Sequence, residues 1–240
     1  GFNKGLFEWL RKAPWGNPCF SGMFMSLVGF GFLGGISGVM MGTEQLNMII
    51  HNTIYVPGHF HATVVIGTTL TFMALTYYLI PVLFKREMIN PGLAKWQPYL
   101  FGLSMYGFVL VMMGAGTLGV SRRHWDMAFQ GAALAYEWPG AAYLMMGLVG
   151  LTGVVAIAGG AIFVYITVGS LLWGRKLETG AESPKFTPIP RAAPTVAAQT
   201  YGSMGFAAPG TFALAMVFLL AFVLYYFINW KYLSTLWGLS

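Results

Sequence analysis

Two histidines near the start of a long apolar stretch have the spacing that points most directly to chemistry. His59 and His61 lie in the run HNTIYVPGHFHATVVIGTTLTFM, residues 51–73. A helix turns about 100° per residue, so side chains at positions i and i+2 point about 200° apart. One metal ion is not easily bound by both imidazoles of such a pair. Two metal centres can be bound, one on each side of the helix, with Phe60 between their ligands.

Haem iron is the metal that this pair favours, because imidazole is a common axial ligand of haem. The alternative is that a histidine in a membrane span is a hydrogen-bonded packing residue. Gly58 has no side chain, and we expect it to leave room beside His59 for a planar macrocycle. Pro57 is expected in the first turn of the helix or at a local kink.

A second constellation, Arg122-Arg123-His124, follows the third apolar stretch. The planar fork of an arginine guanidinium suits carboxylates, and a haem carries two of them as propionates. His51 precedes the second stretch and is expected at the same end of the bundle. Asp126 is a further partner for either arginine, and ordinary anchoring at the membrane interface is the alternative role.

Membrane helices are the elements that must position these residues. The 240 residues are 57% hydrophobic and 8% charged, with a mean hydropathy of +0.66, whereas soluble domains carry roughly 25% charged residues. A helical span needs about 20 predominantly apolar residues. Five stretches satisfy this requirement: 20–42, 53–84, 99–119, 141–173 and 210–226. The sequence therefore predicts an all-α integral membrane helical bundle with five transmembrane helices.

The net charge of +6 is explained by the loops and does not indicate a nucleic-acid partner. On the side of the N-terminus the loops carry ten basic residues, and on the other side they carry three. Positive residues favour the cytoplasm. The N-terminus and the Pro-rich linker 174–207 are therefore predicted to be cytoplasmic. The loops 43–52 and 120–138 and the C-terminus are predicted to face outward.

The first span contains GFGFLGGISG, residues 29–38, in which Gly31 and Gly35, and Gly34 and Gly38, are four residues apart. Small residues at this spacing let a helix or a flat cofactor approach closely. Helix packing is the preferred interpretation, because transmembrane helices are rich in glycine.

The run HNTIYVPGHFH closely resembles the tenth-helix motif of subunit I in haem–copper oxygen reductases, and most of all in the B-family terminal oxidases. The run SRRHWD, residues 121–126, resembles the PRR segment of the same family, with Ser121 in place of proline. The first motif is very specific, and the arginine pair alone is a weak signal. The resemblance covers the whole chain and implies the last five helices of a thirteen-helix subunit.

The resemblance also implies a role for each residue of the histidine pair. His59 would be the proximal ligand of a high-spin haem, of a or o type, at the oxygen site. His61 would ligate a low-spin haem, of b type. Phe60 would lie between them, near the electron path.

Other implied roles concern the propionates. His51 and Asn52 would lie beside those of the high-spin haem, where protons and water leave, and Arg122 and Arg123 would pair with propionates. Asn47 departs from the pattern, because relatives often carry an acid at this position. A carboxylate that shares a hydrogen bond with a propionate is therefore not expected here.

The resemblance further implies a copper ion with three histidine ligands and a second axial histidine for the low-spin haem. The chain has four histidines, and only His124 remains once His51, His59 and His61 are assigned. The missing ligands are therefore expected outside this chain, in the N-terminal half of subunit I. A first residue of Gly1 in place of Met is in keeping with a processed or partial chain.

The expected activity is that of a terminal oxidase in a prokaryotic cell membrane. It would reduce oxygen to water and pump protons outward, with electrons from cytochrome c through a copper-containing subunit II. Three alternatives remain at this stage. They are a nitric oxide reductase of the same superfamily, a haem-free transporter or channel whose histidines relay protons, and an assembly subunit with vestigial histidines.

Overall fold

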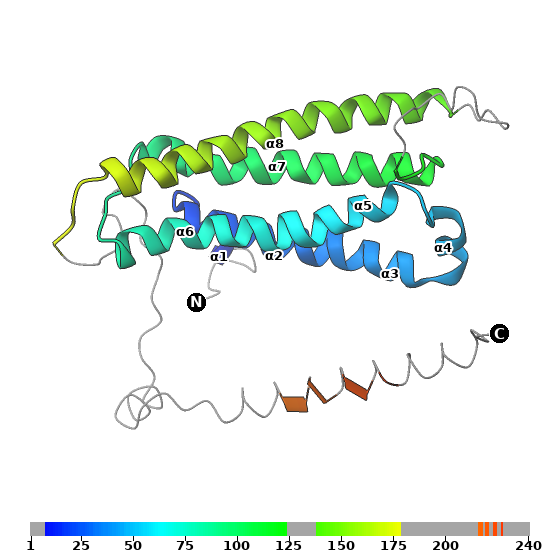
Figure 1. Ribbon diagram of the computed structural model, residues 1–240, viewed down its shortest axis with the longest axis horizontal. Coiled ribbons are helices and arrows are strands. Elements are labelled where there is room, and N and C mark those ends of the chain that lie inside the picture. The colour runs from blue at the N-terminus through cyan, green and yellow to red at the C-terminus, as the bar shows by residue number, and fades with distance from the viewer. Residues whose placement is uncertain are drawn as a thin grey trace. The chain divides into compact units, whose positions relative to one another are not determined.

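The computed structural model describes residues 8–123 and 138–178, together with seven helical residues between 216 and 227. Within these ranges the regular structure is helical apart from two isolated β-bridges. The elements are α1 (Glu8–Arg11), α2 (Pro18–Gly29), η1 (Phe30–Gly35), α3 (Ile36–Gly42), α4 (Glu44–Ile50), α5 (Tyr55–Phe60), η2 (His61–Thr69), α6 (Leu70–Leu83), α7 (Pro91–Thr117) and α8 (Gly140–Trp173), where η marks a π-helix (Figure 1).

Four continuous helices in the described ranges are long and apolar enough to cross a membrane. They are Pro18–Gly42, Tyr55–Leu83, Pro91–Thr117 and Gly140–Trp173. The predicted all-α membrane bundle is confirmed. The fifth expected span, 210–226, lies outside the described residues except for scattered helical positions, and the expected linker 174–207 lies outside them beyond Glu178.

Two boundaries differ from the sequence-based expectation. The third span begins at Pro91 and not near residue 99, because Asn90 caps it with a left-handed backbone (φ 46°) and Pro91 suits the first helical position. The expected outer loop 43–52 contains the short helix α4. Its start is favoured by the extended backbone of Thr43 and by the negative charge of Glu44 in the first turn.

The second span packs against the first span and against α7. Its inner face repeats every four residues, with Ala62, Ile66 and Leu70 fully buried. These side chains join Met105 and Val109 of α7 in one hydrophobic cluster. The helix α8 runs alongside α7 over most of its length (Figure 1). The buried face of the second span is thus covered by apolar side chains of its neighbours.

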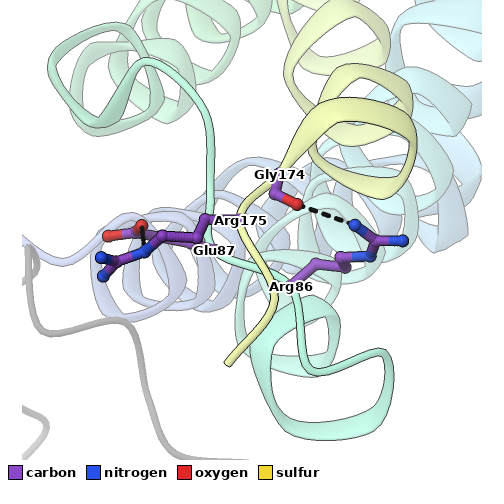
Figure 2. A network of polar contacts seen from close by, with 4 residues as sticks. All are labelled: Arg86, Glu87, Gly174 and Arg175. Carbon is purple, nitrogen blue, oxygen red and sulfur yellow. Dashed lines mark hydrogen bonds and ion pairs between the residues drawn. The ribbon is translucent and has the colours of Figure 1, made fainter. Parts of the chain in front are cut away.

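At one end of the bundle, the link between α6 and α7 makes polar contacts with the residues that follow α8 (Figure 2). We call this set of contacts, formed by Arg86, Glu87, Gly174 and Arg175, the polar strap. The backbone N–H of Glu87 donates to the carbonyl of Arg175 over 2.8 Å. The Arg86 guanidinium donates to the carbonyl of Gly174 over 2.9 Å, and Arg175 Nε lies 3.2 Å from Glu87 Oε2. This strap joins the second, third and fourth spans at the end that is rich in basic residues.

The opposite end brings the segment before α5 against the segment after α7. The backbone N–H of Ile54 donates to the carbonyl of Val120 over 2.8 Å, and that of Arg122 donates to the carbonyl of Asn52 over 2.9 Å. Trp138, just before α8, and Ala142, in its first turn, pack in the same apolar cluster as Ile54 and Val120. The two segments that carry the predicted propionate partners are thus held side by side.

Gly116 is the residue that allows α7 to approach the start of α5. A Cβ added there would lie 2.2 Å from the backbone N and 2.7 Å from the Cα of Tyr55. We expect Gly116→Ala to destabilise the assembled protein by about 1–3 kcal/mol, because backbone atoms cannot move aside as a flexible side chain can. A lower thermal unfolding temperature of the purified complex would report this loss.

The matched control for Gly116 is Gly147→Ala on α8, where an added Cβ meets no heavy atom within 4 Å. This control is expected to be neutral or slightly stabilising, because alanine favours helix over glycine. Equal unfolding temperatures for the two variants would contradict the close approach at Gly116.

Candidate functional site

His59 faces the first membrane span. Its Nδ1 lies 2.8 Å from the hydroxyl oxygen of Ser37 on α3. A Cβ added at Gly38 would lie 3.1 Å from His59 Cε1, so the glycine leaves space for the edge of the imidazole ring. Gly34, one turn earlier, makes a similar close approach to Thr63. Both glycines therefore serve helix packing, as preferred from the sequence.

His61 faces the third span. Its ring lies beside Phe108 of α7, with 5.1 Å between the ring centroids. Its Nδ1 lies 2.7 Å from the carbonyl oxygen of Pro57, one turn back along α5. A carbonyl oxygen can only accept, so Nδ1 is the donor, and in the neutral imidazole Nε2 then keeps its lone pair. This is the tautomer that can bind a metal ion through Nε2.

The two imidazoles point to opposite sides of the second span, as their spacing predicts. His59 contacts α3, and His61 contacts α7. The helix changes from α to π at His61, where η2 begins, and π segments occur often at functional sites. Phe60, between the histidines, is 55% exposed, and its ring centroid lies 5.8 Å from that of His59.

The expectation for Gly58 was wrong. A Cβ added at Gly58 would lie 2.8 Å from Met113 Cγ and 3.3 Å from the backbone N of Met113. The missing side chain therefore allows α5 to pack against α7 and does not open space for a macrocycle. Pro57, in contrast, is the third residue of α5 and lies in the first turn, as predicted.

Asn52 and Arg122 are brought together by the fold. Arg122 Nη2 donates to Asn52 Oδ1 over 2.7 Å, although the two residues are 70 positions apart. Asn52 (φ 61°) and Arg123 (φ 68°) both have a left-handed backbone, which turns the chain sharply at each position. His51 is exposed at the end of α4, just before this turn.

The remaining sequence-based candidates lie elsewhere. His124 and Asp126 fall outside the described residues. Asn47 is in α4, and its carbonyl accepts the backbone N–H of His51 over 2.7 Å. Among residues 8–123 and 138–178, no group of three or more His, Cys, Asp or Glu side chains could hold a metal ion.

Two neighbours of the histidines escaped sequence reasoning. Ser37 precedes His59 by 22 residues, and Phe108 belongs to a different span from His61. The only signal for Ser37 was its place between Gly34 and Gly38 in the glycine-rich run. Nothing in the sequence around Phe108 distinguished it from the other phenylalanines.

The comparison with known families agrees with the histidine geometry. A profile described as cytochrome C and quinol oxidase polypeptide I matches residues 4–151, more than half of the chain. The chain belongs to this family. The matched region contains the first three spans, both histidines of the pair, and Asn52 with Arg122.

Individual members of the oxidase family show how much of their length the chain matches. It is 34% identical over 185 residues to a cytochrome c oxidase subunit 1 of Thermus thermophilus, covering 75% of this chain and 31% of that protein. The subunit 1 of Candida albicans is 30% identical over 155 residues, covering 62% of this chain and 29% of that protein. The chain thus spans about a third of the length of these relatives.

A solved structure supports the same assignment. A chain of a heme-copper terminal oxidase dimer superposes with a TM-score of 0.65 and 27% sequence identity, covering 84% of this chain and 36% of that chain. The helical arrangement of this oxidase-family chain is therefore shared with part of a heme-copper oxidase.

Proposed function

We propose that this chain is the C-terminal part of subunit I of a terminal oxidase, and that it supplies one axial ligand to each of two haems. The observation that supports this proposal is the pair of oppositely directed imidazoles on one helix. Each has its Nδ1 engaged by a neighbour, at 2.8 Å in His59 and at 2.7 Å in His61. Haem-ligating histidines usually have this second contact, which orients the ring and leaves Nε2 for the iron.

The two haems, when bound, would supply electron transfer and the site of oxygen reduction. His59 would hold a high-spin haem of a or o type, and His61 a low-spin haem of b type. The single rigid helix keeps the two ligands at a constant separation, with Phe60 between them. The protein's part is therefore ligation, orientation and the exclusion of water from the path between the centres.

His51 and Asn52 would lie beside the propionates of the high-spin haem, and Arg122 and Arg123 would pair with haem propionates. The 2.7 Å contact with Asn52 fixes the direction of the Arg122 guanidinium and leaves its other N–H groups for a carboxylate. His51 is exposed at this end of the bundle, where protons and water would leave.

The complete enzyme that we propose contains more than this chain. The copper ion and the second axial histidine of the low-spin haem would be held by the N-terminal half of subunit I. Electrons would come from cytochrome c through a copper-containing subunit II. Oxygen would be reduced to water, and protons would be pumped outward across the cell membrane of a prokaryote.

Optical spectroscopy of the purified complex tests this proposal. We expect reduced-minus-oxidised bands of two haems, of which one is altered by carbon monoxide, and oxygen consumption with reduced cytochrome c. Absence of haem bands would favour a proton-relay transporter or an assembly subunit. Turnover of nitric oxide without oxygen consumption would favour a nitric oxide reductase.

The orientation that we propose places the polar strap on the cytoplasmic side of the membrane and α4 on the outer side. Ten of the thirteen basic residues belong to the loops on the strap side. We expect Gln45→Cys, on exposed α4, to react with an impermeant maleimide in intact cells, and Lys176→Cys to react only after permeabilisation. Native Cys19 is buried and serves as the unlabelled background. The reverse labelling pattern would overturn both the orientation and the proton-exit role of His51.

The propionate role of Arg122 predicts a lower haem reduction potential in Arg122→Gln. Losing the cation leaves a carboxylate undercompensated, which favours the oxidised haem. A lost charge partner of this kind is worth on the order of 1–3 kcal/mol, and about 59 mV corresponds to about 1.4 kcal/mol. The expected drop is therefore tens of millivolts to about 100 mV, measured by redox titration of each haem.

Arg122→Lys is the control for this prediction, because lysine keeps the charge but cannot reproduce the fork that also contacts Asn52. It should recover only part of the shift. Arg123→Gln, titrated in parallel, tests the neighbouring cation. Wild-type potentials in both Gln variants of the assembled complex would mean that the arginines are interfacial anchors.

A further inference from the structure

Ser37 is a buried hydroxyl in direct contact with a proposed metal ligand. The residue lies on α3 and is 2% exposed. Its Oγ lies 2.8 Å from His59 Nδ1 and also makes hydrogen bonds with the carbonyl oxygens of Leu33 and Gly34, the second over 3.1 Å. One hydroxyl group therefore connects the imidazole to the backbone of the first span.

The direction of these hydrogen bonds follows from the number of available protons. A serine hydroxyl has one proton, and the carbonyl oxygens of Leu33 and Gly34 can only accept. If the proton pointed to His59, the Ser37 oxygen would face both carbonyl oxygens without a proton between them. The proton therefore lies on the carbonyl side, and the Ser37 oxygen accepts from the Nδ1–H of His59.

We propose that Ser37 is the positioning residue of His59, which sets its tautomer and adjusts its strength as a ligand. The inference rests on the proposed role of His59 as a haem ligand and adds the residue that controls it. The relay runs from His59 Nδ1–H to Ser37 Oγ–H and on to the Leu33 carbonyl. A hydroxyl that donates to a carbonyl is polarised and becomes a better acceptor. The stronger acceptor orients the Nδ1–H and increases electron donation from the imidazole to a bound iron.

Gly38 complements Ser37 on the same helix. A Cβ at Gly38 would lie 3.1 Å from His59 Cε1 and 3.8 Å from His59 Nε2. The glycine therefore leaves room for this edge of the ring, where a larger residue would collide with it. Rotation of the ring about its χ2 torsion would break the contact between Nδ1 and Ser37, so α3 orients the direction in which Nε2 points.

The two histidines differ in how their Nδ1–H is held. His61 donates to the backbone carbonyl of Pro57, which no side-chain substitution removes. His59 donates to a side chain that can be replaced while the backbone is retained. A change at Ser37 should therefore affect one centre and leave the other unchanged, which a general loss of stability would not do.

Ser37→Ala in the purified complex is the direct test. The variant loses the acceptor, so His59 becomes a weaker electron donor to iron. We expect the iron–histidine stretching band of the reduced high-spin haem to shift to lower frequency. The midpoint potential of that haem should rise, and that of the low-spin haem should stay at the wild-type value. Ser37→Thr, which restores a hydroxyl, should return both signals toward wild type.

The matched control is Ser26→Ala. Ser26 is also 2% exposed on the first span, and its hydroxyl contacts the second span at the Gly67 carbonyl over 2.7 Å and at Thr71 Oγ1 over 2.6 Å. Neither of these two partners is a histidine. Equal shifts in the Ser26 and Ser37 variants would overturn the proposal, as would unchanged signals in an assembled Ser37→Ala complex.

Two further variants keep the result interpretable. If Ser37→Ala does not assemble, Ser37→Cys provides the test, because a thiol is a weak acceptor and should give a smaller shift in the same direction. Unchanged signals in Ser37→Cys would then count against the proposal. His59→Ala distinguishes a failure of the Ser37 proposal from a failure of the ligand role of His59. If the iron–histidine stretching band is lost in His59→Ala but unshifted in Ser37→Ala, only the role of Ser37 is refuted. If the band is retained in His59→Ala, the ligand role of His59 is refuted.

Discussion

Replacement of His61 by alanine is expected to remove the low-spin haem and leave the carbon-monoxide-binding haem in place. His61 offers Nε2 on the side of α7, because its Nδ1–H is engaged by the Pro57 carbonyl over 2.7 Å. Alanine removes this ligand without adding volume, and the Phe108 ring beside it remains. The low-spin band in the reduced-minus-oxidised spectrum should fall to background in His61→Ala.

The control for this prediction is Phe108→Leu, which alters the packing beside His61 but retains the imidazole. It should keep the low-spin band, with at most a shift in its position. Equal loss of both haems in His61→Ala and in His59→Ala, in complexes that still assemble, would contradict separate ligation by the two histidines.

Replacement of His59 by alanine is expected to have the opposite spectral effect and the larger effect on activity. The high-spin haem should lose its proximal ligand, and the spectral change on addition of carbon monoxide should disappear or change in form. Loss of an outer-shell partner alone typically costs about 10–100-fold in metal affinity or activity. Loss of the ligand itself should therefore lower oxygen consumption by more than about 100-fold.

Chemical rescue makes the His59 prediction more specific. In His59→Gly the space left by the imidazole lies beside Ser37 and Gly38, so added imidazole should restore part of the carbon monoxide signal. His51→Ala is a second histidine variant that removes a proposed propionate neighbour but no iron ligand, since His51 is exposed at the end of α4. It should keep the carbon monoxide signal, with at most a shift in position. Loss of the haem signal in His51→Ala, or its retention in His59→Ala, would contradict the assignment.

The sequence by itself determined the class of protein and the opposed directions of the two histidines. Apolar stretches of span length are a property of composition alone, and they predicted the four spans of the described ranges to within a few residues except at the start of α7. The angle between positions i and i+2 is a local property of any helix. It was therefore predictable that His59 and His61 contact different neighbours, and the change to a π-helix at His61 did not alter this outcome.

The tertiary structure decided which groups complete the site. Ser37 lies 22 positions before His59, and Asn52 lies 70 positions before Arg122, so both pairs depend on how separate spans pack. The function of Gly58 was mistaken for the same reason, because its close neighbour Met113 belongs to another helix. Local periodicity gives the direction of a side chain, and for His61 it also gives the partner, because the Pro57 carbonyl lies four residues earlier in the same helix. The partner of His59 is determined by a contact between separate spans, which in the proposed relay leaves Nε2 of His59 available to a metal.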